Sequence, residues 1–156
     1  MSAISILQRG SRRPPAFFFS IWLLLLGMLV CCASAWAAPT ASAELIKRGE
    51  YVARLGDCVA CHTSPNGAAM AGGLELKTPF GTIYSTNITP DTKTGLGRYS
   101  FAQFDRAMRK GVAADGHNLY PAMPYPSYAK ITPDDMQALY AYLQHGVAPV
   151  AQPNRA

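Results

Sequence analysis

Three segments of the chain place apolar residues at the spacing of an α-helix. They are residues 43–55, 101–110 and 133–145. In each segment apolar side chains recur every three or four positions, as from Phe101 to Phe104 and Met108, so that they share one helix face. The pattern predicts three main helices and an all-α fold.

Residues at the ends of the second and third segments are those that begin and end helices. Ser100 and Gln103 have the spacing of a capping box. Thr132 precedes Pro133, which suits the first position of a helix. A glycine follows each of these two segments, and glycine commonly ends a helix. We therefore expect helices with the bounds 101–110 and 133–145.

Gly49 lies inside the first predicted helix. Glycine costs helix stability relative to alanine, so its presence requires a reason. A close crossing by the third helix, at Tyr140, would supply one.

Residues 63–99 separate the first two predicted helices and hold six glycines and three prolines. Only Thr82–Tyr84 has the composition of a strand. So long a stretch without elements normally argues against an assignment. A large cofactor changes that argument, because the loop can wrap around it and bury apolar residues against it.

The first 37 residues have the order of a secretory signal peptide. Three arginines in residues 9–13 come first, an apolar run over 17–30 with one serine follows, and Ala35-Trp36-Ala37 comes last. We expect cleavage after Ala37. The alternative is an uncleaved membrane anchor, for which the apolar run is short, since a span needs about 20 residues.

The leader distorts the composition of the chain, which is 49% hydrophobic, 15% charged and formally +5. Residues 1–37 hold three of the 14 basic residues and none of the nine acidic ones, so the other 119 carry a charge of only +2. This small charge argues against a nucleic-acid partner. Cys31 and Cys32 lie in the leader, which leaves Cys58 and Cys61.

The residues Cys58-Val59-Ala60-Cys61-His62 form a Cys-x-x-Cys-His motif, the attachment signal for c-type haem. Positions i, i+3 and i+4 share one side of a helical turn. Both cysteines can therefore reach the vinyl groups of one porphyrin, and His62 can ligate its iron.

Three other uses of the motif are less well supported. A structural zinc site needs four ligands, and the remaining pair, His117 and His145, lies 28 residues apart. A thioredoxin-like pair needs alternating strands and helices around it, which the chain lacks. A disulfide between residues so close in sequence would be strained.

The sixth ligand of the iron has six candidates after the motif: Met70, Met108, Met123, Met136, His117 and His145. Met108 and Met136 lie on apolar helix stripes, where methionine usually fills the core. Met123 lies in Tyr120–Pro126, whose three prolines stiffen the chain and can hold a thioether in place. We predict Met123 as the ligand, with His117 as the alternative. Methionine and histidine together leave no open site, which favours electron transfer.

Five stretches of the chain resemble one family over residues 46–150. They are Arg48–Tyr51, Gly56–Thr63, Thr78–Asp91, Tyr120–Tyr128 and Ala138–Leu143. They resemble the first haem domain of the multi-haem cytochrome c subunit of bacterial membrane-bound alcohol, gluconate and sorbitol dehydrogenases. The resemblance implies a small class I cytochrome c fold with long loops around one covalent haem c. It also implies that Met123 occupies the axial position. Members of that family typically carry three Cys-x-x-Cys-His motifs, whereas this chain carries one.

The resemblance further implies a periplasmic electron carrier that is not itself an enzyme. It would take electrons from a dehydrogenase subunit toward quinone or a terminal oxidase, with any membrane association made through that partner. The alternatives are a truncated first domain of a three-haem subunit, and a haem peroxidase or gas sensor with an open sixth site. The expected organisation is a signal peptide (1–37), a cytochrome c domain (38–147) and an extended tail or linker (148–156).

Overall fold

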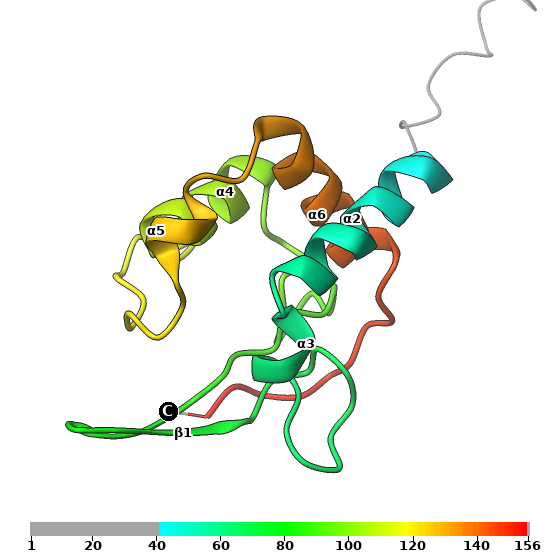
Figure 1. The fold of residues 1–156 in the computed structure, drawn as a ribbon. Coiled ribbons are helices and arrows are strands. Elements are labelled where there is room, and N and C mark those ends of the chain that lie inside the picture. The colour runs from blue at the N-terminus through cyan, green and yellow to red at the C-terminus, as the bar shows by residue number, and fades with distance from the viewer. Residues whose placement is uncertain (1–40, 156) are drawn as a thin grey trace, which may run out of the picture. The chain divides into compact units, whose positions relative to one another are not determined.

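The computed structural model describes residues 41–155, so the predicted signal peptide lies outside the described residues. Five helices and two strands follow one another along this part of the chain (Figure 1). In order they are α2 (Ala43–Leu55), α3 (Cys58–Cys61), β1 (Glu75–Thr78), β2 (Gly81–Tyr84), α4 (Phe101–Lys110), α5 (Tyr125–Tyr128) and α6 (Pro133–His145). No helix among residues 41–155 combines the length and the hydropathy needed to cross a membrane.

The three predicted helices are confirmed as α2, α4 and α6, with the predicted bounds. The capping box of α4 is present, because the Gln103 amide donates to Ser100 Oγ and the Ser100 amide donates to Gln103 Oε1. At α6, Thr132 Oγ1 accepts the Asp135 amide at 3.2 Å. Side chains therefore satisfy amides that the first turn of each helix leaves without a partner.

The prediction of an all-α fold is incomplete, because β1 and β2 form an antiparallel hairpin. Its register runs from Glu75 opposite Tyr84 to Thr78 opposite Gly81. Thr82–Tyr84 was expected to be a strand, but its partner strand was not. Two helices, α3 and α5, were also not expected as helices, because four residues are too few to show a helical period.

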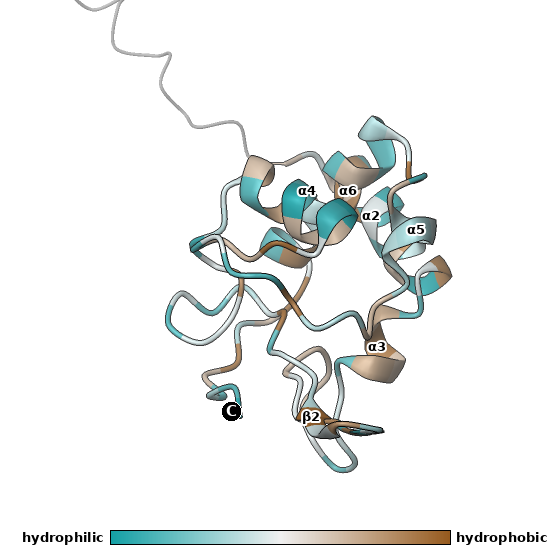
Figure 2. Ribbon diagram, turned by 90° about the vertical axis from the view of Figure 1, so that its left-hand side faces the viewer, coloured by the Kyte–Doolittle hydropathy of each residue, from teal (hydrophilic) through white to brown (hydrophobic). Residues whose placement is uncertain are grey.

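The core lies where α2, α4 and α6 meet. Its buried apolar side chains are Val52, Ala53, Phe104, Met108, Met136, Leu139 and Leu143. Figure 2 shows both hydrophilic and hydrophobic residues on the long helices, as packing on one face requires. An ion pair between Arg48 and Asp135, at 2.8 Å, joins α2 to α6 at the edge of this core.

The close crossing of α2 and α6 at Gly49 is confirmed, but its partner is not Tyr140. A Cβ on Gly49 would lie 2.6 Å from the carbonyl carbon of Ala138 and 2.6 Å from Cβ of Tyr142. The Tyr140 side chain points to α4 instead, where its ring lies 5.4 Å from that of Phe104. Ala138 lies two residues before Tyr140 and Tyr142 lies two residues after it. At this spacing both residues face a different side of the helix from Tyr140.

The end of the described chain returns to the hairpin, as Figure 1 shows for the C-terminal segment beside β1. Residues 148–155 form no helix or strand. They are nevertheless held by hydrogen bonds, since the Asn87 side-chain amide donates to the carbonyls of Val150 at 2.8 Å and Gln152 at 3.2 Å. This tail packs against the loop that follows β2.

Candidate functional site

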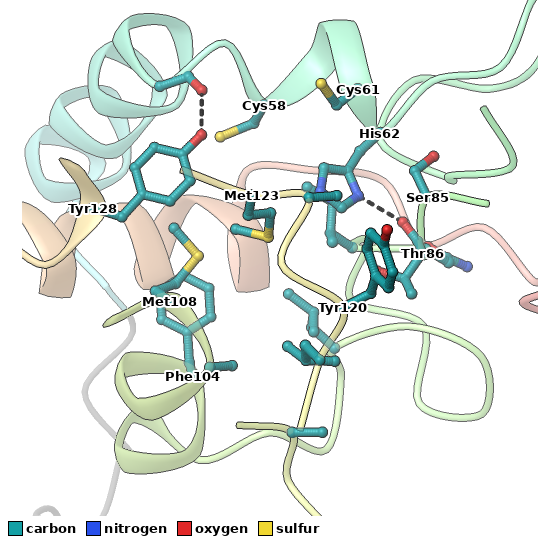
Figure 3. Close-up of a pocket in the computed structure, with 18 of the residues that line it drawn as sticks. Cys58, Cys61, His62, Ser85, Thr86, Phe104, Met108, Tyr120, Met123 and Tyr128 are labelled. Carbon is teal, nitrogen blue, oxygen red and sulfur yellow. Dashed lines mark hydrogen bonds between the residues drawn. The ribbon is translucent and has the colours of Figure 1, made fainter. Parts of the chain in front are cut away.

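A cavity of about 550 Å³ lies among α3, the hairpin, α4 and residues 119–125 (Figure 3). This volume is in the range of pockets that hold cofactors. Most of its walls are apolar, with side chains such as Leu76, Ile83, Leu96, Phe104, Leu119 and Leu139. Apart from five tyrosines, the titratable side chains on its walls are those of Asp57, Cys58, Cys61, His62 and His117, and all of these except His117 belong to α3 and its flanking residues.

Cys58, Cys61 and His62 all line this cavity, as the motif predicts. Helix α3 is a single turn that begins at Cys58, and the His62 amide donates to the Cys58 carbonyl at 2.9 Å. The turn is reached from α2 through Asp57, whose φ of 54° is left-handed. Neither cysteine forms a disulfide bond. Burial raises the pKa of the Cys58 thiol to about 11, so the thiol is neutral at physiological pH.

The His62 ring is oriented by a backbone group that the motif does not contain. Its Nδ1 lies 2.7 Å from the Thr86 carbonyl oxygen (Figure 3). A carbonyl can only accept, so Nδ1 carries the proton and Nε2 keeps a free lone pair. Burial lowers the pKa of His62, and the hydrogen bond to Thr86 opposes part of this effect. The imidazole is therefore held in the neutral form that binds metals.

Met123 lies on the same cavity, and Figure 3 shows its side chain directed into it. The residue is half-buried and belongs to the segment between α4 and α5 that contains Pro121 and Pro124. Two short hydrogen bonds brace this segment, from the Ala122 amide to the Tyr120 carbonyl and from the Tyr125 amide to the Met123 carbonyl, each 2.8 Å. The thioether is thus presented on a stiff support.

Of the other five candidates for the sixth ligand, two line the cavity and three do not. Met136 and Met70 are buried elsewhere and His145 is exposed, and none of the three lines the cavity. His117 reaches the rim of the cavity, but its Nδ1 lies 2.6 Å from Asp115 Oδ1. Met108 is a core residue of α4, as predicted, and it also faces the cavity. Two thioethers therefore border the same space.

The donor set fits a haem c. Two thiols three residues apart, a neutral imidazole with a free Nε2 and a thioether border one apolar cavity, and these are the groups by which c-type haem is attached and ligated. Among the residues that the structure describes, no three His, Cys, Asp or Glu side chains cluster as ligands for another metal.

The helices around this cavity and the Cys-x-x-Cys-His turn on its wall define a small c-type cytochrome. In agreement, residues 46–146 match the family "Cytochrome c". The chain belongs to the cytochrome c family.

Relatives of the chain include cytochrome subunits of dehydrogenases. It is 64% identical over 117 residues to the "Alcohol dehydrogenase (quinone), cytochrome c subunit" of Gluconacetobacter polyoxogenes, and the aligned region covers 75% of this chain and 25% of the relative. It is 60% identical over 136 residues to the "Gluconate 2-dehydrogenase cytochrome c subunit" of Pantoea cypripedii, with 87% and 30% covered. The "Fructose dehydrogenase cytochrome subunit" of Gluconobacter japonicus is 49% identical over 110 residues, with 70% and 23% covered. The chain thus spans less than a third of the length of these relatives.

Proposed function

We propose that this chain is a single-haem electron carrier in which Cys58 and Cys61 hold haem c by thioether bonds and His62 and Met123 ligate its iron. The observation that carries the proposal is one cavity bordered by both thiols, by the neutral His62 imidazole and by the Met123 thioether. When bound, the haem supplies a one-electron couple between ferric and ferrous iron.

The chain's own residues contribute binding, orientation and exclusion of water. The Thr86 carbonyl fixes the tautomer and orientation of His62 through the 2.7 Å hydrogen bond. The prolines beside Met123 limit its movement, so its thioether would be held in place as a ligand of a bound haem. Apolar walls such as those of Leu96, Phe104 and Leu139 exclude water from the cavity.

The electron route that this function implies begins at a dehydrogenase subunit and ends at quinone or a terminal oxidase. The relatives are named as cytochrome subunits of alcohol, gluconate and fructose dehydrogenases, which supports a dehydrogenase as the donor. The location is the periplasm, with export by residues 1–37, a cytochrome c domain over residues 38–147 and any membrane association made through the dehydrogenase. Fractionation of cells that express the full chain tests this location, and recovery in the cytoplasm would contradict it.

The ligand assignment is tested with two methionine variants of the haem-loaded protein. We expect one haem per chain, and Met123→Ala should abolish the sulfur–iron absorption near the red edge of the oxidised spectrum. Met108→Leu is the matched control, because it removes the second thioether of the cavity while conserving its volume, and it should keep that absorption.

Three outcomes would contradict this function. If the purified protein contained zinc and no haem, the proposed electron-transfer function would be wrong. Loss of the absorption in Met108→Leu and not in Met123→Ala would reassign the ligand to Met108. High-spin iron and rapid carbon monoxide binding in the unsubstituted protein would indicate an open sixth site and a peroxidase or gas-sensing role.

A further inference from the structure

The C-terminal tail contacts the cavity wall at the residue that follows Thr86. Asn154 Oδ1 accepts a hydrogen bond from the Asn87 backbone amide at 2.7 Å. Asn154 also lines the cavity, although it lies 92 positions after His62 in the sequence. The tail is therefore part of the site and not a free linker.

Several further contacts fix the tail in this position. The Asn87 side chain, which is only 2% exposed, donates to the carbonyls of Val150 and Gln152. Gln152 Nε2 donates to the Ala71 carbonyl at 3.0 Å, and the guanidinium of Arg155 lies 5.0 Å from the centre of the Tyr84 ring. Because these contacts join the tail to three separate positions, Asn87, Ala71 and Tyr84, Asn154 has a defined place.

The amide that Asn154 binds belongs to the same peptide group as the carbonyl that binds His62. The Thr86 carbonyl and the Asn87 amide are the two ends of one planar trans peptide unit. His62 Nδ1 donates to the carbonyl end at 2.7 Å, and the amide end donates to Asn154 at 2.7 Å. The two hydrogen bonds thus lie on opposite sides of one conjugated group and form a continuous chain.

Hydrogen bonds in such a chain strengthen one another. An amide that donates its proton gains negative charge on its carbonyl oxygen, which becomes a better acceptor. A better acceptor at Thr86 draws the Nδ1 proton more strongly and makes the His62 ring a stronger electron donor through Nε2. A stronger donor stabilises the oxidised form of a ligated metal.

We propose that Asn154 is a positioning residue that acts on His62 through the Thr86–Asn87 peptide group and lowers the reduction potential of the protein. The proposal rests on the proposed function, since it takes His62 as the iron ligand. It extends the functional unit of this chain from the cytochrome c helices to residue 154.

The test compares Asn154→Ala with Asn154→Asp in the full, haem-loaded chain. The alanine removes the acceptor of the Asn87 amide, whereas the aspartate keeps it and strengthens it with a charge. Pro153→Ala is the control, because Pro153 is an exposed neighbour in the same tail. The measurements are the midpoint potential by equilibrium redox titration, and the NMR shift and hydrogen exchange of the His62 Nδ1 proton in the reduced protein.

We expect Asn154→Ala to raise the midpoint potential, to move the Nδ1 proton upfield and to speed its exchange, with haem content and the sulfur–iron absorption retained. Asn154→Asp should leave the potential at or below that of the unsubstituted protein, and Pro153→Ala should change none of these. A tail that only stabilises the fold would change the unfolding midpoint without moving the potential or the Nδ1 proton.

Two results would overturn the proposal. One is an Asn154→Ala protein whose potential and Nδ1 proton match those of the unsubstituted protein. The other is a midpoint potential that is higher in Asn154→Asp than in the unsubstituted protein. This second comparison can be made even if the alanine variant does not retain haem. If the protein carries one haem, either result contradicts only the role of Asn154. If the unsubstituted protein carries no haem, the proposed function itself is wrong.

Discussion

Gly49→Ala tests the packing of α2 against α6. The added Cβ would lie 2.6 Å from the carbonyl carbon of Ala138 and 2.6 Å from Cβ of Tyr142. Carbon atoms pack at about 3.5–4.0 Å, so the helices would have to separate locally by on the order of 1 Å. The obstructing atoms are a backbone carbonyl and the first atom of a side chain, neither of which can rotate away.

Two effects of opposite sign determine the loss of stability. Alanine is the better helix former by roughly 0.5–1 kcal/mol. Overpacking costs about 1–3 kcal/mol, and a backbone obstacle places this case at the upper end. The separation also loosens the core cluster, to which Val52 of α2 and Leu139 of α6 both belong. We expect a net loss of about 2 kcal/mol in the free energy of unfolding.

Thermal and urea unfolding of the haem-loaded protein, followed by far-UV circular dichroism, measures this loss. For a domain of this length we expect Tm to fall by about 5–10 °C. Lys47→Ala is the control, because it places alanine at an exposed position of the same helix and should change stability by less than about 0.5 kcal/mol. A Gly49→Ala protein as stable as the unsubstituted one would refute the close crossing.

Three further substitutions test individual contacts by the same unfolding measurements. Tyr128→Phe removes a 2.8 Å hydrogen bond to the carbonyl at the C-cap of α2 and should cost about 1 kcal/mol. Ser100→Ala removes the capping box of α4 and should also cost about 1 kcal/mol; no loss would mean that the cap is dispensable. Hydrogen bonds from Thr132 and Arg48 lower the pKa of Asp135 in the folded protein. This carboxylate therefore stabilises the fold at pH values above the pKa that Asp135 has in the unfolded chain. The contribution disappears as the pH falls through the lower pKa of the folded protein. Asp135→Asn should therefore be less stable at pH 7, with a deficit that shrinks below about pH 4; a deficit independent of pH would contradict this origin.

Helices α4 and α6 could be predicted with their bounds because two independent signals agreed. Apolar periodicity located α4 and α6, and cap residues such as Ser100 and Thr132 marked where they begin. The hairpin and the two single-turn helices could not be predicted in full, since each covers four residues per element and carries no period. The crossing at Gly49 was predictable from its propensity cost, but the facing residues depend on the rotation of α6.

The site shows the same division between local and distant information. Cys58, Cys61 and His62 lie within five consecutive residues, and their spacing alone places them on one turn. The sequence did not indicate Thr86 or Asn154. Thr86 contributes a backbone carbonyl 24 residues from His62, and Asn154 binds the backbone amide of Asn87, which is 67 residues away. No side-chain pattern records a backbone group, so only the folded chain reveals these contacts.

The cavity also bears on how the chain is stabilised. Seven buried side chains form the core cluster, while many other apolar side chains face a cavity of about 550 Å³. Protein interiors are close-packed, and large apolar voids are few because their walls lose dispersion contacts. A flat apolar cofactor in this space restores those contacts and buries the walls at about 25 cal/mol per Å² of apolar surface. Because α3, the hairpin and the Met123 segment meet across this cavity, the same group that carries the electron would also join these elements to the core.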